Sequence, residues 1–491
     1  MKPPKGEGTY NVVVIGAGTA GLVTAAGTAG LGGRVALIER REMGGDCLNY
    51  GCVPSKALIS SARAVQNMRK AERWGLERHE PLFEFTKVFE RMRARRARIA
   101  SNDSQERFEG LGVDVFRGDA HFVSLHEVAV DGITLRAKHF VIAAGSRAGV
   151  PPIEGIDRVP YFTNETIFDR FHEKPRQMVV IGGGPIGCEL GQTLSRLGVR
   201  VTILQHGPQI LPKEDRDVAE FVQKRFEAEG ITVLIRAETQ HLGMREGQVY
   251  LDVLHRWSGS DEGARLRLTT QALLVAAGRI PNVEDLCLEA AGVKYGKRGV
   301  EVNDYLQTSQ PHIYAAGDIT WRYLFTHTAD AQARVVIRNI LVPFQFLRQK
   351  MDYSVVPWCT YTSPEVARVG LNETEAEARN VAYDLFTQPM ADVDRAVVED
   401  EDAGFVKVLA EKGSDRILGV TLVAEHAGDL LHEFVLAMRH GIGLGKIAST
   451  IHAYPTFAEL ARKVGDRYNR TRLTPRAKAI FEWLYRRQRG A

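Results

Sequence analysis

With 491 residues, the chain is too long for a single hydrophobic core, and we expect three or four domains. A hydrophobic fraction of 44% and a charged fraction of 25% are ordinary for a globular protein, and a formal net charge of +4 is too small to indicate a nucleic-acid partner. The short polar segment 1–10 carries no secretory signal, so we expect a cytoplasmic protein.

A strand, a glycine-rich turn, a helix and a second strand are predicted between residues 10 and 39. The apolar run Tyr10–Ile15 precedes Gly16-x-Gly18-x-x-Gly21, and Glu39 ends the second strand. Glycines at this spacing let a backbone turn approach a pyrophosphate at a helix N-terminus, and the acid can accept a hydrogen bond from a ribose hydroxyl. The pattern predicts a first dinucleotide site.

Cys47 and Cys52 lie just downstream, in the segment Gly44–Lys56. In a regular helix, residues five apart have Cα atoms about 8.7 Å apart, whereas a disulfide tolerates at most about 7 Å. We therefore expect a distorted turn at residues 49–51. The chain has no second Cys or His pair with zinc spacing, so we predict a redox-active disulfide and no resident metal.

A second dinucleotide site is predicted after the strand that begins at Met178. Its fingerprint consists of Gly182, Gly184 and Gly187. Gln205 stands where specificity for NAD would require Asp or Glu, and the missing carboxylate removes repulsion against a 2′-phosphate. The neighbouring His206 could help when it is protonated, so the sequence favours NADPH over NADH.

Strands that end in Ala-Gly recur at residues 273–278 and 313–318, which suggests two similar nucleotide folds, one inserted in the other. From about residue 351, alternating strands and helices indicate a separate α+β domain. The predicted division is a first nucleotide domain over 1–150, a second over 151–280, a segment completing the first over 281–350, the α+β domain over 351–472, and a terminal helix over 473–491.

The terminal helix is predicted to be amphipathic and basic. Its apolar positions are Ala477, Ile480, Phe481 and Leu484, and five Lys and Arg residues surround this stripe. A helix of this kind can lie weakly on an anionic membrane. It can also dock on a partner subunit, which is the interpretation that we favour.

The segment Gly44–Lys56 and the two glycine turns resemble the pyridine nucleotide–disulfide oxidoreductases, the family of glutathione reductase, dihydrolipoyl dehydrogenase and mercuric reductase. The resemblance extends from Asn11 to about Arg472. It implies an α/β fold with two Rossmann-like domains, the NAD(P) domain inserted in the FAD domain, and a C-terminal α+β dimerisation domain. It further implies FAD, NADPH or NADH, and a homodimer.

The resemblance also assigns roles to residues. It implies that Cys47 is the interchange thiol, that Cys52 is the thiolate that contacts the flavin, and that Lys56 and Glu189 pair beside the flavin. Further cofactor contacts that the resemblance implies are Gly45, Ala144, Gly145, Ser146, Gly278, Arg279, Gly317 and Asp318.

The sequence departs from the family at the proton relay, which is a His-Pro dipeptide followed by a Glu. Glu459 matches the Glu, but Tyr454 directly precedes Pro455, and His452 stands two positions early. A phenol, with a pKa of about 10, is a poor base at neutral pH, whereas an imidazole titrates near about 6.5. Tyr at this position resembles mercuric reductases. Two alternatives stay open: His452 takes the role, or Tyr454 is only structural.

We therefore expect electrons to pass to a metal ion or another small electrophile. The alternatives are an NAD-linked dihydrolipoyl dehydrogenase and a redox-sensing or membrane-docking flavoprotein. The mercuric interpretation has gaps: no cysteine follows Cys359, and the usual N-terminal metal-binding domain is missing from this sequence. Asp46 also replaces the usual Thr before the first active-site cysteine, which places a negative charge near the expected pyrophosphate.

Overall fold

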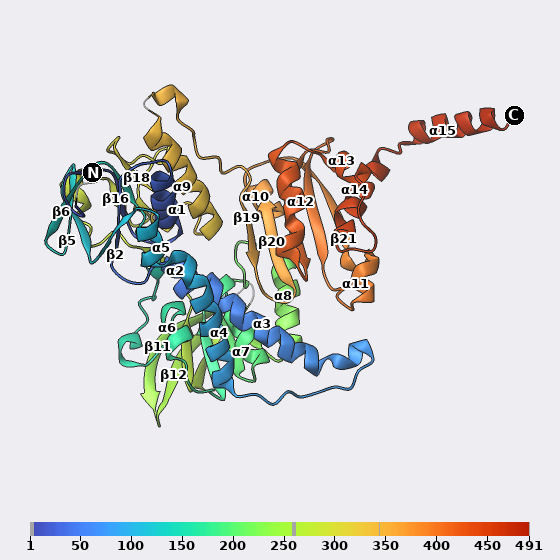
Figure 1. Ribbon diagram of the computed structural model, residues 1–491. Helices are drawn as coiled ribbons and strands as arrows, with labels where there is room; N and C mark the ends of the chain where they lie inside the picture. The colour runs from blue at the N-terminus through green and yellow to red at the C-terminus, as the bar shows by residue number, and fades with distance from the viewer. Residues whose placement is uncertain (1–3, 258–261, 343, 491) are drawn as a thin grey trace. The chain divides into compact units, whose positions relative to one another are not determined.

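The computed structural model describes residues 4–257, 262–342 and 344–490, and the chain forms two compact units (Figure 1). The first unit takes in the described residues up to Met68 together with Glu80–Gly207 and Gly230–Asp352. The second takes in Arg69–His79, Pro208–Glu229 and the described residues from Tyr353 onward. The five domain ranges predicted from the sequence stay a proposal.

A seven-stranded sheet forms one part of the first unit. In spatial order its strands are β3 (Asp114–Arg117), β2 (Val35–Glu39), β1 (Thr9–Ile15), β6 (Ile133–Ile142), β5 (Glu127–Val130) and β4 (Ala120–Ser124), with β18 (Ile313–Ala315) paired to β6. β1 runs parallel to β2 and to β6, with Ile15 in register with Ile38 and with Ile142. These strands therefore end at one edge of the sheet, which is where ligands bind in open α/β folds.

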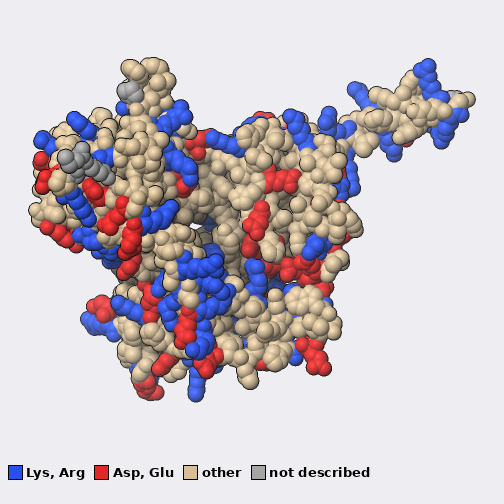
Figure 2. Space-filling model, viewed as in Figure 1, with Lys and Arg blue, Asp and Glu red and all other residues tan. Residues whose placement is uncertain are grey.

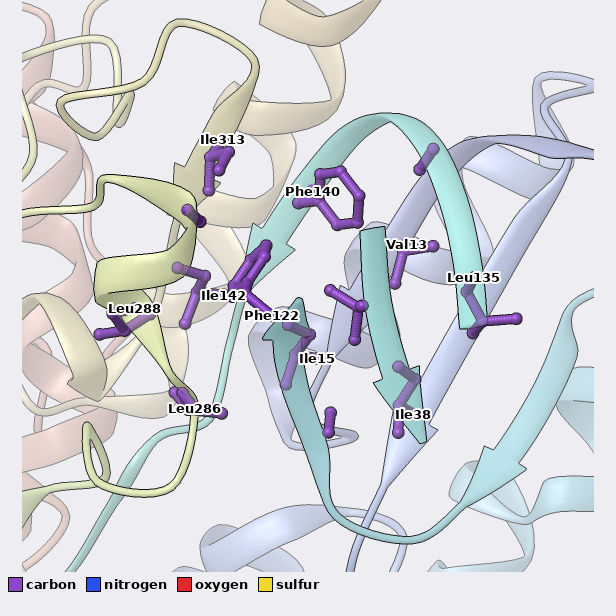
Figure 3. Packing of buried hydrophobic residues seen from close by; sticks show 14 of the residues in the cluster. Val13, Ile15, Ile38, Phe122, Leu135, Phe140, Ile142, Leu286, Leu288 and Ile313 are labelled. Atoms are coloured by element: carbon purple, nitrogen blue, oxygen red, sulfur yellow. The ribbon is translucent and has the colours of Figure 1, made fainter. Parts of the chain in front are cut away.

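Strand β1 is apolar along its length because both faces of the sheet are covered. Val13 and Ile15 belong to a cluster on one face with Phe122 and Phe140 (Figure 3). On the other face, Val14 packs in a cluster with residues of helices α1 (Thr19–Gly30) and α9 (Thr326–Leu341). This core fixes the edge from which the first glycine turn leaves.

The first unit repeats the strand–turn–helix–strand arrangement. A four-stranded parallel sheet has the order β10 (Thr232–Ile235), β9 (Arg200–Gln205), β8 (Gln177–Ile181) and β14 (Ala272–Val275). Helix α7 (Pro185–Arg196) connects β8 to β9, as the second fingerprint predicts. An antiparallel sheet of β11 (Ala237–Arg245), β12 (Gln248–Arg256) and β13 (Gly263–Thr270) completes this part.

Between β2 and β3 the chain is mainly helical. The helices are α2 (Gly45–Asn49), α3 (Cys52–Arg69), α4 (Phe85–Ala100) and α5 (Gln105–Gly110). Helix α2 ends before the second cysteine of the pair and α3 begins at it, so the expected break between the two cysteines is present.

The second unit is built on a five-stranded antiparallel sheet. Its order is β19 (Pro357–Thr360), β20 (Glu365–Gly370), β23 (Ile417–Ala424), β22 (Phe405–Glu411) and β21 (Tyr383–Pro389). The helices that share its hydrophobic cluster are α12 (Ala427–Arg439), α13 (Leu444–Ser449) and α14 (Glu459–Thr471). This is the α+β architecture that the sequence predicts beyond residue 351.

Helix α15 (Pro475–Gln488) forms where the sequence predicts it. The hydroxyl of Thr474 caps the helix by accepting a hydrogen bond from the backbone N–H of Ala477, and Pro475 occupies the first helical turn. No residue of α15 is buried. Within the described part of the chain, no helix has both the length and the apolar character needed to cross a bilayer.

Candidate active site

The first glycine turn is too tight for any other residue type. Gly16 has φ +104°, and a Cβ added there would lie 2.4 Å from the carbonyl oxygen of Ala143. A Cβ on Gly21 would lie 1.8 Å from the carbonyl oxygen of Gly16. Gly18 is the N-cap of α1 and supplies no side-chain cap, so the first N–H groups of α1 stay available for a phosphate.

Glu39 holds this turn from the end of β2. Its carboxylate accepts hydrogen bonds from the backbone N–H of Ala17 at 2.6 Å and of Arg41 at 2.7 Å. A cleft beside it is lined by residues from the ends of β1 and β2 and from three later segments of the chain, including Gly16, Glu39 and Glu284. The glycine cradle, the carboxylate and the cleft fit the adenosine and pyrophosphate parts of FAD.

The second glycine turn repeats this geometry. Gly182 has φ +114°, and a Cβ there would lie 2.4 Å from the carbonyl oxygen of Ala276. Gly184 is the N-cap of α7. The side-chain oxygen of Gln205 accepts a hydrogen bond from the backbone N–H of Gly183 at 2.9 Å, and the neighbouring His206 is exposed.

The two cysteines lie on either side of a break between two helices. Cys47 is in α2, Tyr50 ends that helix with φ −133°, and Cys52 is the first residue of α3. Both cysteines are free thiols that share a hydrogen bond, which is the reduced form of the predicted pair. A Cβ on Gly45 would lie 2.5 Å from the Cα of Gly18, so the helix that carries Cys47 packs directly on the first glycine turn.

The surroundings favour a thiolate at Cys52. The hydrogen bond from Cys47 is the largest influence, and with the charge of Lys56 and a hydrogen bond from Thr326 it lowers the pKa of Cys52 to about 6. Sγ of Cys52 lies 3.7 Å from Oγ1 of Thr326. Because Cys52 begins α3 and Thr326 begins α9, two helix N-termini lie beside this sulfur, and such termini favour a negative charge.

Cys47 has the opposite tendency. Its hydrogen bond to Cys52 raises its pKa, and burial, the charge of Cys52 and the nearby carboxylate of Asp46 act in the same direction. The reduced pair therefore keeps its proton on Cys47 and its negative charge on Cys52.

Lys56 and Glu189 form the ion pair that the sequence led us to expect. Nζ of Lys56, on α3, lies 2.8 Å from Oε2 of Glu189, on α7. The carboxylate of Glu189 is only 7% exposed, so the contact is little screened by solvent. Glu189 thereby fixes the lysine one turn beyond Cys52.

The remaining candidate cofactor residues of the first unit take part in, or lie beside, three groups of hydrogen bonds. Oγ of Ser146 donates to Asp318 at 2.6 Å, and Nε of Arg279 donates to Oγ of Ser146 at 2.7 Å. The backbone N–H of Gly317 donates to the buried Gln332 at 2.6 Å. Ala144, Gly145 and Gly278 lie in the adjoining turns, where Asn282 bonds the carbonyl oxygens of Ala144 and Gly145.

The relay candidates lie in the second unit. Tyr454 is 69% exposed, and its hydroxyl donates to Asp394 at 3.0 Å, which raises the pKa of the phenol. The imidazole of His452 lies 2.9 Å from Glu433 and 2.9 Å from the carbonyl oxygen of Thr450. Neither ring bonds to Glu459 among the interactions of the described residues.

Glu459 is buried at the start of α14. Its Oε1 accepts a hydrogen bond from Arg462 at 2.5 Å, while its Oε2 is buried with no hydrogen-bond partner among the described residues. A buried carboxylate oxygen without a partner is costly. The catalytic roles expected for Tyr454, His452 and Glu459 stay predictions.

Comparison with known proteins decides the family. The model of the pyridine nucleotide-disulphide oxidoreductases matches residues 10–333, and the model of their dimerisation domain matches residues 356–464. The chain belongs to the pyridine nucleotide-disulphide oxidoreductases. It is therefore an FAD-binding enzyme that takes electrons from NAD(P)H, and its dimerisation domain supports a homodimer.

Relatives in this family carry different enzyme names. A mercuric reductase of Lysinibacillus sphaericus is 33% identical over 92% of this chain and 81% of its own length. A dihydrolipoyl dehydrogenase of Thermus scotoductus is 36% identical over 92% of this chain and 95% of its own. The Cu(II) complex of RclA, an HOCl-induced flavoprotein disulfide reductase from Escherichia coli, superposes with a TM-score of 0.82 at 26% identity, covering 94% of this chain and 99% of that one.

These findings confirm the fold class, the family and the cofactors expected from the sequence. In this family FAD, when bound, accepts two electrons from NAD(P)H and passes them to the disulfide. The protein residues position the two thiols, hold Lys56 beside them and keep the charge on Cys52.

Some contacting residues were not identified from the sequence. Thr326 carries no motif in the sequence, yet its hydroxyl lies 3.7 Å from Sγ of Cys52. Asp394, the partner of Tyr454, and Asn164, which bonds both Asp46 and the carbonyl oxygen of Tyr50, carried no motif. Asp46 was the one sequence signal for such a contact, because a carboxylate at this position needs a cation nearby, which in the structure is Arg279.

Proposed function

We propose that this enzyme uses NAD(P)H, with NADPH preferred, to reduce a thiophilic metal ion or another small electrophile at Cys47 and Cys52. The observation that carries the proposal is the hydrogen bond from the hydroxyl of Tyr454 to Asp394. A phenol whose proton is held by a carboxylate, and whose pKa is raised, does not serve as a base at neutral pH. Disulfide exchange needs such a base, whereas metal reduction needs it less.

The relatives support a metal acceptor. Mercuric reductases match over 92% of this chain, and the RclA structure holds Cu(II). In the family pattern, a mercuric reductase has Tyr where this chain has Tyr454.

The reaction balances without a further reductant. Two electrons and one proton, the equivalent of the hydride of NAD(P)H, open the Cys47–Cys52 disulfide and leave a thiol at Cys47 and a thiolate at Cys52. A divalent ion then displaces the proton of Cys47, binds both sulfurs, takes two electrons and leaves as the neutral metal while the sulfur–sulfur bond re-forms.

The test is an anaerobic turnover series with NADPH and NADH. The holoenzyme is offered mercuric ion, cupric ion, lipoamide and glutathione disulfide in turn, beside Cys47→Ser and Cys287→Ser. We expect metal turnover that Cys47→Ser abolishes and that Cys287→Ser, which alters an exposed cysteine outside the pair, leaves unchanged.

Other outcomes would overturn the proposal. Fast turnover of dihydrolipoamide with NAD, without metal reduction, would identify a dihydrolipoyl dehydrogenase, as in the Thermus scotoductus relative. Oxygen consumption that survives Cys47→Ser, with no acceptor reduced, would identify a simple oxidase or a redox sensor.

The sequence alone favours docking of α15 on a partner subunit, but no residue of α15 is buried, and we further propose that the enzyme acts in the cytoplasm and touches an anionic membrane weakly through this helix. The apolar stripe contains Ile480 and Leu484, which are 59% and 42% exposed. Trp483 and Tyr485 flank Leu484 on opposite sides of the helix, at 100° per residue, which places two interfacial aromatic residues at the borders of the stripe. Seven Lys and Arg residues and one Glu lie between residues 470 and 489, so the segment complements anionic lipid (Figure 2).

Co-sedimentation with vesicles tests this contact. We expect binding to phosphatidylserine-containing vesicles that falls with added salt, that is weak on pure phosphatidylcholine, and that is lost in Leu484→Glu. If the helix docks on the partner subunit instead, Leu484→Glu will weaken the dimer and leave vesicle binding unchanged, which would contradict the membrane contact.

A further inference from the structure

Arg236 directly follows strand β10, at the edge of the sheet where the second nucleotide site lies. Strand β10 runs parallel to β9, and its last residue, Ile235, is in register with Gln205. The backbone N–H of Arg236 donates to the carbonyl oxygen of Gly207 at 2.8 Å. Because neighbouring strands lie about 4.8 Å apart, Arg236 stands beside His206, the residue that follows Gln205.

The first nucleotide site shows what a residue at this position contacts. There β3 runs parallel to β2, with Arg117 in register with Glu39, so Gly118 corresponds to Arg236. Gly118 lines the cleft beside Glu39. By this correspondence, Arg236 lies at the wall of the second site, next to the residue that takes the place of Glu39.

The two corresponding residues share a positive φ. Gly118 has φ +138° and Arg236 has φ +52°. Glycine adopts such backbone conformations readily, whereas a residue with a Cβ adopts them at a cost in stability. The second site therefore carries an arginine where the backbone favours glycine, and strained residues of this kind cluster at ligand sites.

The guanidinium of Arg236 is free to meet a ligand. The residue is half-buried, and its side chain makes no hydrogen bond or ion pair with the residues that the structure describes. Glu238, the nearest acidic residue along the chain, is paired with Arg256 at 2.8 Å. The end of β9 offers Gln205 and His206 instead of a carboxylate. A guanidinium in this state fits phosphate oxygens, which it can hold by two parallel hydrogen bonds.

We propose that Arg236 pairs with the 2′-phosphate of NADPH and thereby determines the nucleotide specificity of the second site. The strand that lost the carboxylate, at Gln205, removes the repulsion, and the neighbouring strand supplies the cation. NADH has no 2′-phosphate and gains nothing from this residue. The inference rests on the NADPH preference in the proposed function, and it does not depend on the electron acceptor.

The test is equilibrium binding to the oxidised holoenzyme, measured by titration calorimetry at low and high salt. NADP⁺, NAD⁺, adenosine 2′,5′-bisphosphate and AMP are each titrated into the parent protein and three variants. Arg236→Gln removes the charge, Arg236→Lys keeps it, and Arg236→Gly removes the side chain at a positive φ. Arg245→Gln is the matched control, because Arg245 lies at the far end of β11 and pairs with Glu246 at 3.5 Å.

We expect Arg236→Gln and Arg236→Gly to bind NADP⁺ and the bisphosphate about tenfold more weakly and NAD⁺ and AMP as the parent does, since a charge-assisted contact to phosphate is worth about a decade in affinity. Arg236→Lys should keep part of the affinity and the control all of it. Added salt should weaken NADP⁺ less in Arg236→Gln than in the parent. Arg236→Gly should unfold at no lower temperature than the parent, because glycine accepts the positive φ without strain, so its loss of affinity is separate from any loss of fold.

Two results would overturn the inference. If the parent prefers NADP⁺ and Arg236→Gln keeps that preference, another group binds the 2′-phosphate, and the proposed NADPH preference still stands. If the parent binds NAD⁺ as tightly as NADP⁺, both the inference and the proposed preference fail. Neither result involves metal turnover, so the choice of acceptor is tested separately.

Discussion

Glu39 and Gln205 make the same hydrogen bond in two different nucleotide sites. Each ends the second strand of its strand–turn–helix–strand unit, and each accepts a backbone N–H from the glycine turn, from Ala17 at 2.6 Å and from Gly183 at 2.9 Å. The second site therefore keeps the hydrogen bond to the glycine turn but lacks the negative charge that Glu39 carries in the first site. The turn in the second site is thus supported without a carboxylate that would repel a 2′-phosphate.

Restoring the charge should change the nucleotide preference. In Gln205→Glu we expect the ratio of kcat/KM for NADPH to that for NADH to fall about tenfold, because a carboxylate near the 2′-phosphate repels it. Steady-state kinetics with both nucleotides measure the ratio. Gln205→Met is the control: it removes the hydrogen bond without adding charge and should weaken both nucleotides alike. An unchanged ratio in Gln205→Glu would place the 2′-phosphate elsewhere.

The charges of Lys56 and Glu189 should shift the pKa of Cys52 in opposite directions. The parent thiol titrates near its lowered pKa of about 6, so its thiolate fraction rises as the pH passes upward through that value. Removing the cation in Lys56→Gln should raise this pKa by about one unit. Glu189→Gln removes the opposing carboxylate and should lower it.

The ultraviolet absorbance of the thiolate in the reduced protein, followed against pH, checks both shifts. Shifts of the same sign in the two variants would contradict an electrostatic origin. A Cys52→Ser protein shows which part of the absorbance change belongs to this thiol.

Tyr454 should determine which acceptors are used. In Tyr454→His, an imidazole that titrates near neutral pH replaces a phenol that holds its proton. We expect turnover of disulfide substrates to rise at least about tenfold with a bell-shaped pH profile, since a placed base contributes about a hundredfold or more. Tyr454→Phe, which supplies no base, should show no gain, and equal activity in both variants would exclude a relay role for this position.

The buried Lys407 should stabilise the second unit against unfolding. Lys407 is only 3% exposed and contacts Asp215 at 3.2 Å, Asp217 at 3.0 Å and also Glu373. Lys407→Met leaves these carboxylates without their cation, and we expect a loss of about 3–5 kcal/mol of unfolding free energy. Lys412→Met, which removes an exposed pair with Asp384, should cost less than about 1 kcal/mol. Thermal unfolding of the two variants, each beside the parent protein, measures the difference.

The same cluster gives a pH dependence. Burial alone would raise the pKa of Asp215, but hydrogen bonds from Thr374 and the charge of Lys407 outweigh it and lower that pKa. The stabilisation from Asp215 is therefore present above its unfolded pKa of about 3.9 and is lost as the pH falls through the lower folded value. Lys407→Met should reduce this acid sensitivity, and a parent-like acid profile in the variant would contradict the role of the lysine.

The parts of the structure that the sequence predicts best are those in which backbone geometry restricts residue type. Gly16 and Gly182 fill positions that no side chain could occupy, so strand, turn and helix could be placed from spacing alone. The break at Tyr50 followed from the distance that a disulfide requires. The Lys56–Glu189 pair was found only through resemblance, since neither residue has a local signature.

The contacts that the sequence did not predict join residues far apart in the chain. Arg279 pairs with Asp46 and Asp394 accepts from Tyr454, and in both cases the choice of partner depends on how separate elements pack. Residues of the same charge are abundant along the sequence, so composition offers no way to choose among them.

The division of the chain into two units has an evolutionary consequence. The residues to which we assign nucleotide binding and thiol chemistry, from Glu39 to Thr326, belong to the first unit, while Tyr454, Asp394 and Glu459 belong to the second. If the second-unit residues select the acceptor, as we propose, substitutions in that unit alone would change the acceptor and leave the nucleotide-binding turns and the thiol pair unaltered.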